Sequence, residues 1–272
     1  MAHSCDRTCL RGEGARGFAA NDFVIGREMT AAERRNSVPN PRFLTLDCGP
    51  MRRLHHFALD PFSRKLRVLL REKNLAFELV DERPGDRREE LLHLNPSGEV
   101  PVLVEEHGTV VADSHAISEY LDEVYPEPAL LGRDAGGRAE VRRLVGWFDL
   151  KFDREVTGRL LEEKIMKRLV RSGQPDSQAI RLANANLHIH LQYIAWLADR
   201  RSWLAGDQFS LADITAGAHL SVVDYLGDIP WDAHPEAKDW YARVKSRPSF
   251  RPLLGDHLPG APPPRHYADL DF

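Results

Sequence analysis

Cysteine is nearly absent, because the 272 residues include only Cys5, Cys9 and Cys48. Residues 49–272 therefore hold no disulfide, thiolate zinc site or catalytic thiol. Long apolar runs are absent as well, since none approaches the roughly 18 residues that span a membrane. The N-terminal stretch also lacks the apolar segment of a signal peptide. We therefore expect a cytoplasmic protein with no membrane span.

Positive charge is missing from one long stretch, because no Lys or Arg lies between Arg88 and Arg133. The same stretch is rich in Asp and Glu, whereas the first helix expected before it is basic. The net charge of the chain is only −4, which gives no reason to expect nucleic acid as a partner. Two electrically distinct faces would suit a dimer or a partner interface, and ordinary solvated surface is the alternative.

Familiar catalytic and metal-binding motifs are missing too. The chain has no glycine-rich phosphate loop and no Ser-His-Asp order that a fold would bring together. His188 and His190 lie two positions apart in a predicted helix, so their side chains point away from each other. We therefore predict no metal site.

Residues 1–50 differ from the rest because they show no sustained period of 2 or 3.6 residues. They are either a disordered extension or an upstream stretch that is not translated, with the true start at Met51. The intact mass of the native protein separates these two interpretations.

The pattern of residues 51–130 predicts a β-α-β-α-β-β-α order. Pro61 is expected in the first turn of a helix, where its missing N–H costs nothing. Phe62, Leu66 and Leu69 follow the spacing of a buried stripe on that helix. Its basic residues fill the other face: Arg64, Lys65, Arg67 and Arg71. Strands are predicted at 52–58, 76–80, 100–105 and 109–112, and further helices at 86–93 and from Ser114, which is expected to cap its own helix.

Residues 137–250 are predicted to be all helix, because apolar residues keep a 3.6 period there. Ser210 followed by Asp213 resembles a capping box at a helix start. The last helix is expected at 235–245. Residues 251–272 then form a proline-rich tail in which a long helix is excluded.

Four motifs in this order resemble the glutathione-transferase superfamily. They are the turn Asp60–Arg67, the loop Asn95–Leu103, the turn Asp113–Ile117 and the segment Trp203–Asp213. The resemblance implies the glutathione-transferase fold, in which an α/β thioredoxin-like N-terminal domain precedes an all-α domain. It also implies a homodimer.

The same resemblance implies a glutathione pocket at Val100, Pro101, Asp113 and Ser114. A cis peptide bond before Pro101 would present the Val100 backbone to an extended peptide such as glutathione. Ser114 at a helix N-terminus offers a hydroxyl and free N–H groups to a carboxylate. Each feature also has a purely structural interpretation, as a shaped turn and as a helix cap.

The catalytic position departs from the family pattern. Transferases of this type lower the pKa of the glutathione thiol with a hydroxyl or cysteine near the start of the first helix, and Asp60 occupies the matching position here. A carboxylate would repel the thiolate and raise the thiol pKa. Ser63 is the candidate substitute donor, with His55 and His56 behind it, and no catalytic residue is assigned.

A narrower resemblance is to the FzlA-type bacterial division proteins. It rests on the segments 140–149, 222–232, 247–254 and 262–272. It implies a non-catalytic scaffold that binds filaments of the tubulin-like GTPase FtsZ and links them to septal wall synthesis. The partner-binding tail residues that it implies are His266, Tyr267, Asp269, Leu270, Asp271 and Phe272. The alternative for the tail is a strap that folds back onto its own domain.

Hypotheses of three classes follow. The first is a non-catalytic division scaffold that requires no cofactor, with glutathione as an optional ligand. The second is a glutathione S-transferase that conjugates glutathione to small electrophiles. A general redox accessory protein is the third, and the lack of cysteine after Cys48 disfavours it.

Overall fold

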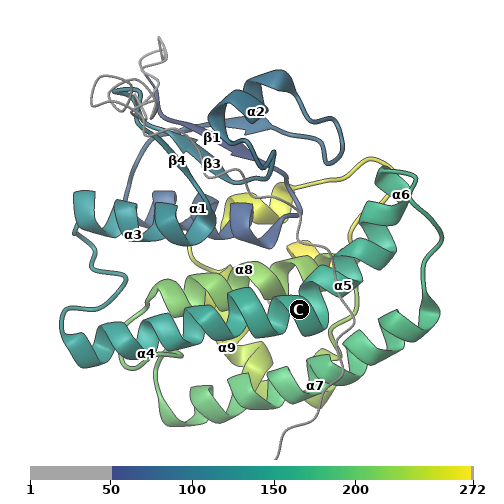
Figure 1. Ribbon diagram of the computed structural model, residues 1–272. Coiled ribbons are helices and arrows are strands. Elements are labelled where there is room, and N and C mark those ends of the chain that lie inside the picture. The colour runs from purple at the N-terminus through teal and green to yellow at the C-terminus, as the bar shows by residue number, and fades with distance from the viewer. Residues whose placement is uncertain (1–50, 271–272) are drawn as a thin grey trace, which may run out of the picture. The chain divides into compact units, whose positions relative to one another are not determined.

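The computed structural model describes residues 51–270, which form an α/β part followed by a helical part (Figure 1). The strands are β1 (Arg53–His56), β2 (Glu78–Asp81), β3 (Val102–Val104) and β4 (Val110–Ala112). The helices of the α/β part are α1 (Pro61–Glu72), α2 (Glu89–Leu94) and α3 (Ser114–Val124). The predicted β-α-β-α-β-β-α order is confirmed, and the two interpretations of residues 1–50 lie outside the described residues.

The four strands form one mixed sheet in the order β2-β1-β3-β4. β1 runs parallel to β2 and antiparallel to β3, and β3 runs antiparallel to β4. Leu54 of β1 lies opposite Leu79 on one side and Leu103 on the other. Leu54 and Leu103 are fully buried, because α1 and α3 lie between the sheet and the helical part (Figure 1).

The helical part is built around α8, every residue of which is buried. Its elements are α4 (Ala135–Gly146), η2 (Trp147–Thr157), α5 (Gly158–Leu161), η3 (Glu162–Met166), α6 (Lys167–Leu169), α7 (Ser177–Arg200), α8 (Leu211–Tyr225), η4 (Trp231–Ala233) and α9 (Pro235–Lys245). The run from α4 to α6 includes two π-helical stretches, η2 and η3. The predicted capping box at Ser210 and Asp213 is confirmed. Among the described residues, no helix is both long and apolar enough to cross a membrane.

The environment of α1 corrects one expectation from the sequence. Arg64, Lys65 and Arg67 are buried rather than displayed on a free face of the helix. The cause is the position of α1 between the sheet and α8 (Figure 1), which leaves little of the helix open to water. Buried cations need acceptors, and these side chains find them in the helical part and in the tail.

The start of α3 corrects a second expectation, because Asp113 rather than Ser114 is the N-cap residue. The Asp113 carboxylate accepts the backbone N–H groups of His115 at 2.8 Å and Ala116 at 3.0 Å. Its φ of 77° lies in the left-handed region, where Asp is one of the more tolerant residues. Ser114 is thereby the first residue of the helix, and its hydroxyl is free for another role.

The tail contains two short 3₁₀ turns, η5 (Arg251–Gly255) and η6 (Arg265–Ala268). Tyr267 is fully buried against the chain's own core. The expectation that a long helix is excluded is met up to Leu270. Residues 251–267 therefore fold back onto the chain's own domain, as one of the two interpretations of the tail expects.

Candidate functional site

Asp60 is the N-cap residue of α1, and Pro61 follows it at the first helical position. The Asp60 Oδ2 atom accepts the backbone N–H of Ser63 at 2.6 Å. The carboxylate thus satisfies one of the helix's open donors, which is the usual role of Asp at this position. The residue at the position that matches the family's catalytic hydroxyl therefore caps a helix in this chain.

Burial raises the pKa of Asp60 to about 6, although hydrogen bonds from Ser63 lower it. Two charged groups of the helical part also act on it: His219 lowers the pKa of Asp60 and Asp153 raises it. Near neutral pH the group is still mostly ionised. It then presents negative charge where a transferase would stabilise a thiolate.

The substitute donors proposed from the sequence are placed elsewhere. Ser63 is fully buried, and its hydroxyl accepts the N–H of Phe57 at 3.4 Å. His55 Nδ1 lies 2.7 Å from Glu82 Oε1. His55 and His56 are both buried residues of β1. Burial lowers the pKa of His56 to about 4, with the Arg67 charge adding to the effect. None of these three side chains lines the cavity beside Asp60.

The four residues expected in a glutathione pocket do come together. Val100, Pro101, Asp113 and Ser114 line one cavity of about 670 Å³, and Asp60 lines it too. The Val100–Pro101 peptide bond is cis, as the sequence predicts. A cavity of this size is large enough for a ligand of a few residues.

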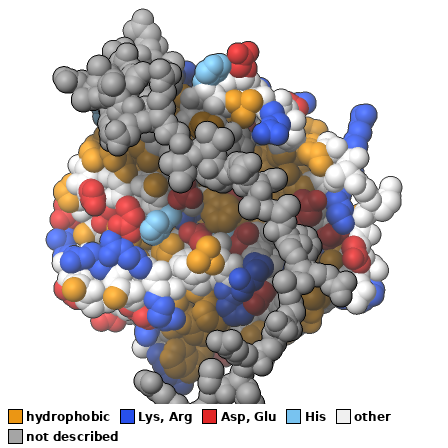
Figure 2. Space-filling model, viewed as in Figure 1, with side chains coloured by type: hydrophobic (Ala, Val, Ile, Leu, Met, Phe, Trp, Pro, Cys, Tyr) orange, Lys and Arg blue, Asp and Glu red, His pale blue; other side chains and the backbone are white. Residues whose placement is uncertain are grey.

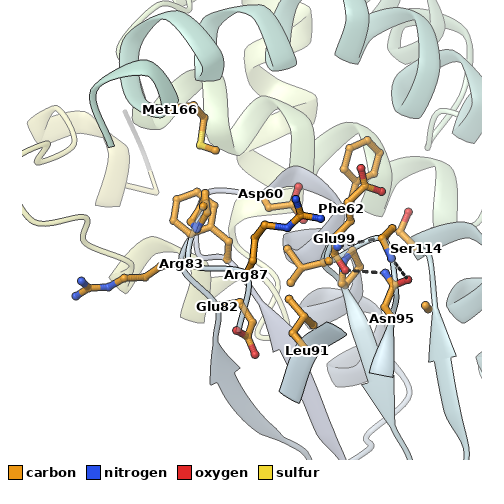
Figure 3. A pocket seen from close by; sticks show the side chains of 18 of the residues that line it. Asp60, Phe62, Glu82, Arg83, Arg87, Leu91, Asn95, Glu99, Ser114 and Met166 are labelled. Carbon is orange, nitrogen blue, oxygen red and sulfur yellow. Dashed lines mark hydrogen bonds between the residues drawn. The ribbon is translucent and has the colours of Figure 1, made fainter. Parts of the chain in front are cut away.

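The cavity lies between the two parts of the chain. In Figure 3, Asp60 and Phe62 approach it from the start of α1, Glu99 and Ser114 from one side, and Met166 from the helical part. The Asn95 side chain donates to the Glu99 carbonyl at 2.9 Å and fixes the loop before Val100. The acidic residues that line the cavity outnumber the basic ones: Asp60, Glu82, Glu99, Asp113 and Glu162 against Arg83 and Arg87.

Lys65 stands behind Ser114 and supplies positive charge to that wall of the cavity. Its Nζ donates to the Ser114 hydroxyl oxygen at 3.0 Å and to Asp149 Oδ2 at 2.6 Å. Asp149 also contacts His219, with 3.2 Å between Oδ1 and Nε2. Burial alone would raise the pKa of Asp149, but Lys65 and His219 outweigh it and hold the pKa below its usual value. Because Ser114 accepts from Lys65, its own O–H is available to donate to a ligand.

No metal site is apparent within residues 51–270, where no group of three or more His, Cys, Asp or Glu side chains is suitably placed. His188 and His190 are not a pair. His188 contacts His234 at 2.9 Å instead, and His190 contacts Glu155 at 3.0 Å.

The acidic stretch between Arg88 and Arg133 is partly neutralised by neighbouring elements. Figure 2 shows acidic and basic side chains side by side where α3 and α4 lie. Arg142 of α4 pairs with Glu119 of α3 at 2.7 Å. The acidic face that the sequence suggests is therefore partly neutralised by basic side chains of the same chain.

The implied tail residues fall into different environments. Tyr267 is buried, His266 contacts the buried Asp224 at 3.2 Å, and Asp269 is exposed. Leu270 is half-buried. Asp271 and Phe272 lie outside the described residues.

Sequence reasoning missed the roles of Arg64 and Lys65. Both were assigned to a polar helix face, and both are fully buried with acceptors far along the chain. Charge spacing within α1 holds no signal for this, because the acceptors belong to η2, α8 and the tail. Their roles depend on tertiary contacts alone.

Family models match both parts of the chain. The N-terminal domain of glutathione S-transferase matches residues 54–129, and the C-terminal domain of glutathione S-transferase matches residues 169–248. FtsZ-localized protein A of Caulobacter vibrioides is 52% identical over 224 residues, which cover 81% of this chain and 98% of that protein. The chain belongs to the glutathione S-transferase superfamily. Within that superfamily it is of the FzlA type.

Solved structures of related proteins agree with this assignment. The crystal structure of a glutathione S-transferase from Rhodospirillum rubrum is 61% identical, with a TM-score of 0.80. The structure of FzlA from C. crescentus is 52% identical, with a TM-score of 0.79. Each match covers 82% of this chain and 100% of the other chain. The glutathione-transferase fold predicted from the sequence is confirmed.

Proposed function

We propose that this protein is a non-catalytic scaffold of the glutathione-transferase fold that binds FtsZ filaments at the division site and links them to septal wall synthesis. The observation that carries the proposal is the 52% identity with FtsZ-localized protein A over 98% of that protein's length. The similarity extends over nearly the whole length of that protein, so it is not confined to one domain. The scaffold is cytoplasmic and homodimeric in this proposal, and it needs no cofactor.

The site geometry supports the absence of catalysis. The position that would hold a thiolate-stabilising hydroxyl is occupied by Asp60, and the Ser63 hydroxyl is fully buried beside it, where it accepts the Phe57 N–H. An ionised carboxylate disfavours a neighbouring thiolate electrostatically. Glutathione is in this view an optional ligand of a pocket that retains its shape.

The experiment is co-sedimentation of the full-length chain with FtsZ polymerised by GTP, with free glutathione titrated in. Pelleting that depends on polymer and is indifferent to glutathione supports the scaffold. A deletion of Ala268–Phe272, which spares the buried Tyr267, tests the tail, because the scaffold proposal expects filament binding to persist while division fails. Normal division after that deletion would contradict the proposed role of the tail.

A glutathione S-transferase that conjugates glutathione to small electrophiles is the second candidate. The cavity that collects Val100, Pro101, Asp113 and Ser114 favours it. With the Asp60 pKa near 6, only the protonated carboxyl would donate a hydrogen bond to the thiolate. Conjugation would then be strongest below about pH 6 and would fall as the pH rises.

Two measurements separate the candidates. Calorimetric titration of the full-length chain with glutathione reports binding, and a chromogenic aryl halide at pH 5.5 and 7.5 reports conjugation. Ser63→Ala tests the remaining hydroxyl, since the enzyme hypothesis that uses it expects activity to be lost. Saturable glutathione binding without filament pelleting would favour the enzyme.

A further inference from the structure

A cavity of about 500 Å³ lies at the end of the helical run from α4 to α6. Its wall consists of the loop Gly173–Pro175 and of four cationic side chains: Lys164, Lys167, Arg168 and Arg171. Among the described residues, no Asp or Glu lines it, and it shares no lining residue with the cavity beside Asp60. This basic cavity is therefore separate from the site described above.

The two lysines of the basic cavity are held by carboxylates that are more deeply buried than they are. Lys164 Nζ lies 2.6 Å from Asp228 Oδ2, and Lys167 Nζ lies 2.6 Å from Glu163 Oε2. The side chains of Asp228 and Glu163 are 7% and 10% exposed, whereas those of Lys164 and Lys167 are 30% and 23% exposed. The ammonium groups thus have fixed positions and remain partly open to water, so little freedom is lost when an anion binds.

The two arginines of the basic cavity have no such partner. Both Arg168 and Arg171 are exposed, and within residues 51–270 neither makes an ion pair or a side-chain hydrogen bond. The carboxylate of Asp176, which follows the loop, is engaged as the N-cap of α7. The two guanidinium groups are therefore available to carboxylates from outside the chain.

The backbone conformation at Arg171 is unusual for this residue type. Its φ of 57° lies in the left-handed region, and the N–H of Ser172 donates to the Lys167 carbonyl at 3.0 Å, which closes the helix end. Glycine or asparagine is the common choice at such a position, because a longer side chain is less stable there. An arginine in this place gains nothing from contacts within the described chain, which is the situation expected when its side chain serves an external ligand.

The loop after β2 extends the positive charge beyond the basic cavity. Gly85 lies so close to the end of the helical run that a Cβ at this position would be 3.2 Å from Cγ1 of Val170. Arg83 and Arg87 flank Gly85, are exposed and make no ion pair within the described residues. Asp86 is the one acidic residue among positions 83–88. The loop and the cavity thus form one continuous basic surface.

Apolar side chains lie next to the arginines of the cavity. Leu169 and Val170 are 39% and 40% exposed and stand between Arg168 and Arg171 in the sequence. Clustered arginines are the groups by which proteins recognise acidic motifs, and they pair with carboxylates through directional hydrogen bonds. The cavity lining contains no aromatic side chain on which a base could stack, so an acidic peptide fits better than a single-stranded nucleic acid.

We propose that the basic cavity binds an acidic segment of a partner protein in which apolar side chains are interspersed. Arg168 and Arg171 pair with carboxylates of that segment, Lys164 and Lys167 supply fixed positive charge, and Leu169 and Val170 contact its apolar side chains. The site is separate from the proposed binding of FtsZ filaments, and its test does not use them.

The experiment measures fluorescence anisotropy of a fluorescein-labelled peptide of Asp-Leu-Glu repeats, titrated with the full-length chain. The double variant Arg168→Gln with Arg171→Asn removes both unpaired charges, and Asn tolerates the left-handed backbone. We expect its dissociation constant for the peptide to rise at least about tenfold. Its melting temperature should not fall, since neither arginine has a partner within the described chain.

The matched control is the double variant Arg133→Gln with Arg138→Gln, which removes the same number of charges around the start of α4. Figure 1 shows α4 and α6 at opposite ends of the helical part. We expect this control to bind the peptide like the wild type. A peptide with Ser in place of Leu tests the apolar contact and should bind more weakly to the wild type.

Each other outcome overturns the proposal. Equal weakening in the two double variants would show attraction by overall charge without a site. Binding of inorganic pyrophosphate at the cavity without binding of the peptide would show a small-anion site. Recruitment to vesicles of phosphatidylserine and phosphatidylcholine that depends on Arg168 and Arg171, again without peptide binding, would show a membrane contact.

Discussion

The Nζ of Lys65 lies 2.6 Å from Oδ2 of Asp149, and this ion pair connects the first helix of the α/β part to the helical part. The Lys65 side chain is fully buried and that of Asp149 is 10% exposed. Such a pair is far more sensitive to the loss of one partner than an exposed pair, because the remaining charge stays out of water. It also supports the Ser114 wall of the cavity from behind.

We expect Asp149→Asn to lower the free energy of unfolding by about 3 kcal/mol, because Lys65 loses its counter-charge in a buried site. The double variant Lys65→Met with Asp149→Asn should recover part of this loss, since no unpaired charge remains. Urea unfolding of each variant gives the values.

The control for this prediction is the exposed pair of Arg133 and Glu127, whose side chains are 74% and 66% exposed. Glu127→Gln should change the free energy of unfolding by less than about 0.5 kcal/mol. Equal effects of Asp149→Asn and Glu127→Gln would contradict the importance of burial.

Asp60→Asn should stabilise the fold at neutral pH. Burial raises the pKa of Asp60 from 3.8 to about 6, so between about pH 4 and 6 the folded state keeps a proton that the unfolded state releases. Stability therefore falls as the pH rises through that window. Asn still caps α1, and we expect a gain of about 2 kcal/mol at pH 7.5. At pH 4 the gain should nearly vanish.

Asp134, the N-cap residue of α4, is the matched control for that pH dependence. Backbone hydrogen bonds from Gly137 and Gly136 hold the pKa of Asp134 below its usual value, so its contribution is present above about pH 4 and lost as the pH falls. Asp134→Asn should destabilise at pH 7.5, opposite in sign to Asp60→Asn. Thermal melts at both pH values check the pair, and changes of the same sign would be inconsistent with the assigned pKa directions.

Asp213→Ala should be much more destabilising than Ser210→Ala. The Asp213 carboxylate is fully buried and accepts the N–H groups of Leu204, Ser210 and the Trp240 indole at 2.9–3.1 Å. The Ser210 hydroxyl donates to the same carboxylate at 3.0 Å. Removing the carboxylate leaves these four buried donors without that acceptor, for a loss of at least about 3 kcal/mol. Removing only the Ser210 cap should cost about 1 kcal/mol. Similar losses in urea unfolding would argue against this network.

Ser114→Ala separates the pocket from the scaffold. Its hydroxyl lines the cavity and accepts from Lys65, so any glutathione affinity measured by calorimetry should fall at least about tenfold, the value of one charge-assisted hydrogen bond. FtsZ pelleting should not change. A loss of pelleting in a variant that melts like the wild type would place the filament contact at the cavity.

Several elements follow from local pattern alone. Pro61 and the apolar spacing after it predict α1, and Ser210 with Asp213 predicts the start of α8, because these signals lie within a few residues of each other. The segment 235–245 was predicted with the bounds that α9 has. Strand ends were predicted less well, since β1 and β3 are shorter than expected and pairing between strands decides where each ends.

The site was predicted only in part. The family motifs identify Val100, Pro101, Asp113 and Ser114, and these four residues do line one cavity. The cap of α3 is Asp113, one residue before the Ser114 that the sequence predicts. Ser63 is a candidate donor from its position near the helix start, but its hydroxyl is fully buried and accepts the Phe57 N–H. Sequence spacing does not report which way a side chain faces when both faces of its helix are covered.

The sequence by itself determined the order of elements, the membership of the glutathione S-transferase superfamily and the carboxylate at Asp60. These properties depend only on residue types and on spacings of a few residues. The tertiary structure alone decided that Arg64, Lys65 and Tyr267 are fully buried. Their side-chain partners lie 49 to 203 positions away in the chain, and only the packing of α1 between the sheet and α8 brings those groups within hydrogen-bonding distance.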